Sequence, residues 1–296
     1  VASDLVTMEN GTTVNAGPHT MRRIITQDPK TGENVTVWGP DLVKYPLNMY
    51  GERASSIGVY GHEIGHDWNG LIAKFLDKSG EGGVLTNSVK KALGEKYGET
   101  ATIVAKDGTR KELVVNGEKW TNGRLIEDYL RATRDENTSD IIGTAWTGIN
   151  MPLALARLLM SGRRNGNLMD NSNVFSPSKM SNPDNPMGFE VHAIDALRMV
   201  IGAKTIEYLG KGNPALEAQA KSLIALSREG STKGEYELYN LDKPGQKIVI
   251  ERDVMDNVIA ELITAQMETP LSVLEGKTFS SILPPLKDNW PKMEKL

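Results

Sequence analysis

Apolar residues recur at spacings of three and four over several long segments, which is the pattern of helices with one buried face. One such stripe runs from Ile57 to Leu76 in a stretch without proline. Gly61 and Gly65, four residues apart, would leave a bare strip on this helix where another backbone can approach closely. Further helices are predicted over residues 84–97, 122–135, 138–162, 189–212, 213–230 and 253–267.

Capping residues and proline suggest where two of these helices begin or break. Ser139 or Asp140 is the candidate N-cap of the helix that runs to residue 162, and Pro152 is expected to break or kink it. The helix over residues 189–212 would contain His192 near its start.

Shorter alternating segments separated by turn residues predict β-hairpins. Their turns fall at Asn10-Gly11, at residues 28–32, at Asp107-Gly108 and at residues 243–245. Because helical segments dominate, the sequence predicts an α+β fold that is mainly helical, with peripheral β-hairpins.

A loop rich in Asn, Ser, Pro, Asp and Gly over residues 163–188 divides the predicted elements. Residues 1–162 would hold the hairpins and the first helix, and residues 189–296 would form a helical part with one hairpin. We expect both parts to form one compact catalytic unit. A loop of this length is usually functional or mobile, so it is a candidate lid or substrate rim.

Composition narrows the class of protein. The 296 residues are 39% hydrophobic and 24% charged, which are globular values. The net charge of −4 and the lack of a Lys- and Arg-rich face argue against a nucleic-acid partner, and no apolar run is long enough to cross a bilayer. The chain has no cysteine and begins at Val1, which favours an exported protein, periplasmic or extracellular, after signal-peptide removal.

The chemistry concentrates in the run His62-Glu63-Ile64-Gly65-His66, which contains two of the four histidines. On a helix, positions i and i+4 share one face, so both imidazoles can reach one metal ion. This run resembles the H-E-x-x-H signature of zincin metallopeptidases. The resemblance implies that His62 and His66 bind Zn²⁺, that Glu63 is the general base, and that the substrate is a peptide or protein.

The resemblance covers about a dozen residues, and the pattern around it narrows the subfamily. Asp67 stands where zincins usually have an uncharged residue. Asn69 and Ile72 replace the glycine and third histidine of metzincins, which argues against a metzincin.

A zinc site of this kind needs a third protein ligand, for which the sequence offers three sources. His192 ranks first, because acidic residues at 190 and 195 could orient its ring. Asp77 is the nearest downstream aspartate beyond Asp67, and a glutamate could come from a second helix. The glutamate candidates are Glu95, Glu99 and Glu127. Candidate donors to a developing oxyanion are Tyr60, Arg53 and Arg198.

Two other functions fit parts of the sequence. The pair His66-Asp67 resembles HD-type metal phosphohydrolases, with His19 or His62 as the first ligand and Asp195 as the last. Alternatively, hairpin decorations and a core with 12 methionines are compatible with a non-enzymatic structural or binding protein.

Overall fold

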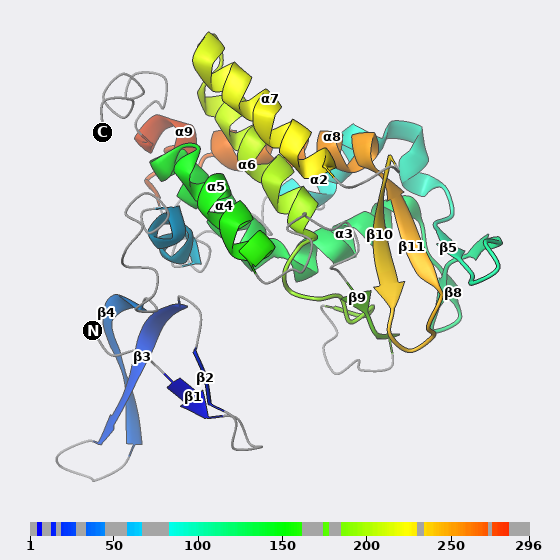
Figure 1. Cartoon of the computed structure of the whole chain (residues 1–296), viewed down its shortest axis with the longest axis horizontal. Helices are drawn as coiled ribbons and strands as arrows, with labels where there is room; N and C mark the ends of the chain where they lie inside the picture. Colours follow the sequence, from blue (N-terminus) through cyan, green and yellow to red (C-terminus); the bar gives the residue numbers. More distant parts are fainter. Residues whose placement is uncertain are drawn as a thin grey trace.

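The computed structural model describes the side chains of residues 58–66, 83–159, 174–177, 185–229, 234–271 and 274–283. It also describes the backbone of the N-terminal strands and of residues 160–161. Helices make up most of the described chain and the strands form small sheets, which confirms the mainly helical α+β class (Figure 1).

The N-terminal strands form two antiparallel pairs. β1 (Leu5–Thr7) pairs with β2 (Thr13–Asn15), and β3 (His19–Gln27) pairs with β4 (Asn34–Lys44). These pairs flank the turns predicted at Asn10-Gly11 and at residues 28–32, so both predicted hairpins are confirmed.

The helices follow the predicted order, with shifted ends. One helix covers residues 58–66, inside the first predicted stripe; residues 67–82 lie outside the described part of the chain. The others are α2 (Gly83–Leu93), α3 (Asn122–Ala132), α4 (Arg134–Thr147), α5 (Asn150–Ser161), α6 (Asp195–Leu209), α7 (Pro214–Arg228), α8 (Arg252–Glu268) and α9 (Phe279–Ile282).

A five-stranded sheet has the order β6-β5-β11-β10-β9. It is built from β5 (Thr102–Val104), β6 (Arg110–Glu112), β9 (Val174–Phe175), β10 (Glu235–Asn240) and β11 (Lys247–Glu251). The hairpins predicted around Asp107-Gly108 and residues 243–245 are therefore confirmed. β9 lies inside the predicted loop 163–188 and pairs parallel with β10, so part of that loop is a strand.

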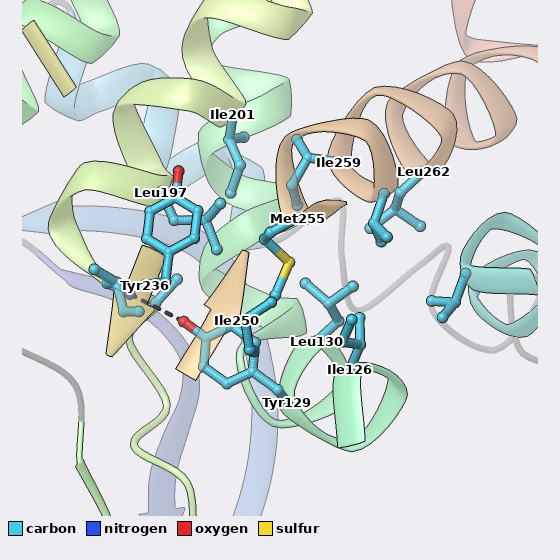
Figure 2. Packing of buried hydrophobic residues seen from close by; sticks show 14 of the residues in the cluster. Ile126, Tyr129, Leu130, Leu197, Ile201, Tyr236, Ile250, Met255, Ile259 and Leu262 are labelled. Carbon is cyan, nitrogen blue, oxygen red and sulfur yellow. Dashed lines mark hydrogen bonds between the residues drawn. The ribbon is translucent and has the colours of Figure 1, made fainter. Parts of the chain in front are cut away.

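The main hydrophobic core lies between α3, α6, α8 and the sheet. Figure 2 shows Tyr129 and Leu130 from α3 beside Leu197, Tyr236 and Met255, which come from α6, β10 and α8. α6 also packs against α4, α5 and α7 (Figure 1). Residues from both sides of the predicted loop thus share one core, an arrangement in keeping with one compact unit.

Two predicted helix starts are wrong, and both errors concern the functional region. α4 begins at Arg134 after Thr133, so Ser139 and Asp140 are buried in its middle. α6 begins at Asp195, so His192 precedes this helix. The Glu190 amide donates to the Val174 carbonyl at 3.1 Å, and the Ile194 amide donates to the Tyr129 hydroxyl at 3.1 Å. These bonds hold the segment against β9 and α3 in a non-helical conformation.

α4 ends where glycine permits it. Gly148 has a φ of 62° and caps the helix, so the chain turns before Pro152, which lies in the first turn of α5. The predicted break near Pro152 is confirmed. Within the described residues, no helix combines the length and the hydrophobicity that crossing a membrane requires.

Candidate metal centre

The helix at residues 58–66 and α4 contact each other through glycine. A Cβ atom added to Gly65 would lie 2.5 Å from the Cα of Ser139, and one added to Gly143 would lie 2.8 Å from the amide nitrogen of His62. Real Cβ atoms do not approach other atoms this closely, so larger residues would force the helices apart. The predicted bare strip at Gly61 and Gly65 is therefore a close backbone contact, and it brings His62 over the buried face of α4.

The two histidines of the motif converge as the helical spacing predicts. Their Nε2 atoms lie 3.2 Å apart, and their rings are nearly perpendicular, with centroids 4.7 Å apart. Glu63 is 5% exposed, and its carboxylate lies within 4.8 Å of a ring nitrogen of each histidine. Among the described residues, His62, Glu63 and His66 are a group that could hold a metal ion.

Glu136, in the first turn of α4, faces both imidazoles. Its Oε2 lies 3.4 Å from Nε2 of His62, and its Oε1 lies 3.6 Å from Nε2 of His66. Two tetrahedral ligands held about 2.0–2.1 Å from zinc are about 3.3 Å apart. The two Nε2 atoms are thus at the spacing of two zinc ligands, and each has one of the two Glu136 oxygens at a similar distance.

The other ring nitrogen of each histidine also faces a carboxylate of α4. Nδ1 of His62 lies 2.8 Å from Oδ1 of Asp140, and Nδ1 of His66 lies 3.0 Å from Oδ2 of Asp135. The first contact is short but not aligned as a hydrogen bond from the ring, so it is an electrostatic pair. The two carboxylates place negative charge beside the outer nitrogen of each ring, which favours positive charge on the imidazoles.

Arg198 of α6 joins two carboxylates of α4, the buried Asp140 and the partly buried Glu136. Its Nε lies 2.7 Å from Oδ2 of Asp140 and its Nη2 lies 2.8 Å from Oδ1, a two-pronged contact. Nη2 also lies 3.1 Å from Oε2 of Glu136. Arg198 is 5% exposed and the Asp140 side chain is fully buried, so each charge depends on the other for compensation.

This arrangement changes the proton affinity of its members. Burial would lower the pKa of His62, but Asp140 and Glu136 outweigh burial and raise it to about 9. Burial would raise the pKa of Asp140, but Arg198 and His62 lower it to about 2. Burial also opposes the lowering of the Glu136 pKa, which His62 and Arg198 cause. The negative charge that holds a proton on His62 would equally favour a divalent cation.

His192, predicted as the third ligand, lies at the edge of this cluster. Its Nε2 is 3.6 Å from Oε1 of Glu136, and its Nδ1 is 3.7 Å from Oε1 of Glu190. The side chain is 55% exposed, whereas those of His62 and His66 are 12% and 19% exposed. The structure thus brings His192 to the site, on its solvent side.

The remaining ligand candidates have other surroundings. Glu127 accepts hydrogen bonds from the hydroxyls of Tyr97 and Thr86, at 2.6 and 3.0 Å. Glu95 and Glu99 are exposed in and after a short 3₁₀ helix, Gly94–Gly98. Asp77, like Asp67 and Arg53, lies outside the described residues.

Glu136 and Asp140 belong to the site, although neither was predicted there from the sequence. Both belong to the run Asp135-Glu136-Asn137-Thr138-Ser139-Asp140, where Glu136 and Asp140 are four residues apart. On a helix this spacing puts them on one face. The signal was therefore present, but it was hidden by the prediction that the helix begins at Ser139 or Asp140.

Comparisons with known proteins give no further guidance to this site. No protein-family model matches the chain, and searches of curated proteins and of solved structures find no match. The function must therefore be inferred from the site itself.

Proposed function

We propose that this protein is a zinc-dependent peptidase in which His62, His66 and Glu136 hold the metal and Glu63 is the general base. The observation that carries the proposal is the mutual approach of three side chains that can bind a metal. The two Nε2 atoms lie 3.2 Å apart, and each has a Glu136 oxygen within 3.6 Å. The resemblance of the His62–His66 run to zincins supports the same conclusion.

Each side chain has a distinct role in this proposal. Zinc, when bound, would polarise the substrate carbonyl and lower the pKa of a bound water. Glu63 is placed to take the proton from that water, because its carboxylate lies within 4.8 Å of both histidine nitrogens. Asp140 and Asp135 supply negative charge beside the two imidazoles, and Arg198 keeps Asp140 and Glu136 ionised.

We propose His192 as the donor to the developing oxyanion, in place of its predicted role as a ligand. Its ring is 55% exposed and faces Glu136 from the solvent side, where a substrate would approach. Arg198, an earlier candidate for this role, is buried and already paired with Asp140 and Glu136. Tyr60 is half exposed on the helix at residues 58–66 and remains a second candidate.

The charge of the site favours a peptide over a phosphate ester. Four carboxylates of the described residues surround the histidine pair: Glu63, Asp135, Glu136 and Asp140. Such a field repels a phosphate dianion and accepts a neutral amide. The HD-type phosphohydrolase is therefore the second candidate; its Asp67 lies outside the described residues, and its Asp195 is buried at the start of α6.

Metal content and peptide hydrolysis test the proposal together. Wild-type protein purified without an affinity tag should contain about one zinc per chain, the stoichiometry of a single catalytic site. His66→Ala and Glu136→Gln should lose that zinc, whereas Glu95→Gln should keep it. The zinc-loaded wild type should cleave a mixed peptide library and leave phosphomonoesters intact.

Two outcomes would overturn the proposal. A wild-type protein that binds no stoichiometric zinc after metal is added back would favour the structural or binding protein. Hydrolysis of phosphomonoesters but not peptides would favour the phosphohydrolase. Export, predicted from composition, stays a prediction that cell fractionation can check.

A further inference from the structure

Acidic side chains border the solvent side of the metal centre. Asp135 and Glu190 are 61% and 47% exposed, whereas Glu136 and Arg198, deeper in the cluster, are 14% and 5% exposed. The His192 ring lies between Glu190 and Glu136, with contacts of 3.7 and 3.6 Å. A substrate that reaches the metal centre past His192 therefore passes close to Glu190.

The backbone that carries Glu190 is firmly held. Its amide bonds to the Val174 carbonyl in β9 at 3.1 Å. The preceding residue, Phe189, is buried and exchanges two hydrogen bonds with the Asn185 side chain, both of 2.9 Å. The position of Glu190 at the site is thus set by the sheet and by a closed turn.

The network of described residues around the metal centre is strongly negative. Its guanidinium comes from Arg198, and its carboxylates are Glu63, Asp135, Glu136, Asp140 and Glu190. With one divalent ion bound, the carboxylates still outnumber the positive charges. A positively charged side chain is therefore attracted to the rim of this site, and a negatively charged one is repelled.

We propose that Glu190 is a specificity-determining residue that favours peptides with lysine or arginine close to the scissile bond. This inference rests on the proposed peptidase function and names its substrate class. One imidazole ring separates Glu190 from Glu136, and neighbouring residues of a peptide are 3.8 Å apart. The long side chain of a lysine one or two residues from the scissile carbonyl can therefore reach the Glu190 carboxylate.

The test compares three peptide series on the zinc-loaded protein. Each series scans one residue, Lys, Gln or Glu, through a neutral peptide, and mass spectrometry locates the cleaved bond. We expect kcat/KM to fall in the order Lys, Gln, Glu. Glu190→Gln should reduce the Lys-to-Gln ratio about two- to fivefold, the effect of one exposed ion pair. The matched control, Glu229→Gln, removes an exposed carboxylate at the end of α7 and should leave the ratio unchanged.

The salt dependence of cleavage is a second test of the same preference for lysine. Raising the ionic strength from about 0.01 M to about 1 M shortens the screening length from about 30 Å to about 3 Å, so the Lys-to-Glu ratio should shrink. Hydrolysis without this order of preference, or a Lys-to-Gln ratio that is unchanged in Glu190→Gln, would overturn the inference and leave the peptidase standing. No hydrolysis of any series would overturn the peptidase and this inference with it.

Discussion

Leu197 and Arg198, neighbours on α6, belong to two regions that are stabilised in different ways. Leu197 packs into an apolar core with Tyr236, Met255 and Ile259, where fit depends on volume and shape (Figure 2). Arg198 enters a charged cluster, where it pairs with Asp140 and Glu136. A change in the core leaves a gap that neighbours can partly fill, whereas a change in the cluster leaves a buried charge without its partner. One helix thus contributes to a region held by the fit of apolar side chains and to a region held by the pairing of buried charges.

The largest effect is expected for Glu63→Gln, which tests proton transfer in the charged region separately from metal binding and stability. Glutamine keeps the size of the side chain but cannot accept a proton, so kcat should fall about 10²- to 10⁴-fold. The metal content and the thermal unfolding midpoint should stay close to those of the wild type. Steady-state kinetics and elemental analysis on the same samples check this. Full activity in the zinc-loaded variant would exclude Glu63 as the base.

The contrast between the apolar core and the charged cluster is tested by replacing Leu197 and Arg198, one at a time. Arg198→Met leaves Asp140 buried without its cation and should cost about 3–5 kcal/mol in the free energy of unfolding. It should also weaken zinc binding about 10- to 100-fold, as loss of a residue behind the ligands does. Leu197→Ala should cost a similar 2–5 kcal/mol through its cavity but leave zinc affinity nearly unchanged.

Denaturant unfolding and competition with a zinc chelator measure the two quantities separately. If both variants lose zinc affinity in proportion to their stability, the charged cluster has no separate role and the contrast between the regions fails.

A smaller effect is expected where the two helices touch. Gly143→Ala would push a methyl group to within 2.8 Å of the His62 amide nitrogen, so the helix at residues 58–66 must shift. We expect a loss of about 1–3 kcal/mol in the free energy of unfolding, together with weaker zinc binding. The control is Gly98→Ala, because a Cβ there has no atom within 4 Å. Equal behaviour of both variants would show that the close contact does not set the position of the histidines.

The apolar region was largely predictable from the sequence, since its helices and hairpins follow from spacing and turn residues. The five-residue motif also predicted that His62 and His66 converge, because i, i+4 geometry is local. What failed was the boundary between α3 and α4. Asp140 resembles an N-cap in the sequence, but it is buried in mid-helix because Arg198, 58 residues later, compensates its charge. Local propensity cannot reveal a partner at that distance.

The prediction that His192 lies on a helix was wrong for a related reason. Apolar spacing extended its helix six residues too far towards the N-terminus, past a segment held by hydrogen bonds to β9 and α3. Pairing between such distant segments leaves no local pattern. The prediction that His192 lies near the metal centre was nevertheless correct, because its ring contacts Glu136, a carboxylate that was not predicted to belong to the site.

The smallest effect lies outside the charged cluster, at a half-buried hydrogen bond between α3 and the short 3₁₀ helix. The Tyr97 hydroxyl donates to Glu127 at 2.6 Å; partial burial and this carboxylate raise the pKa of Tyr97 to about 12. A folded pKa above the unfolded value of about 10 means that the bond stabilises the protein below pH 10 and that this contribution is lost as pH rises towards 12. Tyr97→Phe keeps the ring and should cost about 1 kcal/mol at neutral pH. Between pH 10 and 12 the difference between the two proteins should shrink, as measured by denaturant unfolding. A constant difference across this range would show that Glu127 does not hold the proton on Tyr97, and that this half-buried pair depends on packing rather than charge.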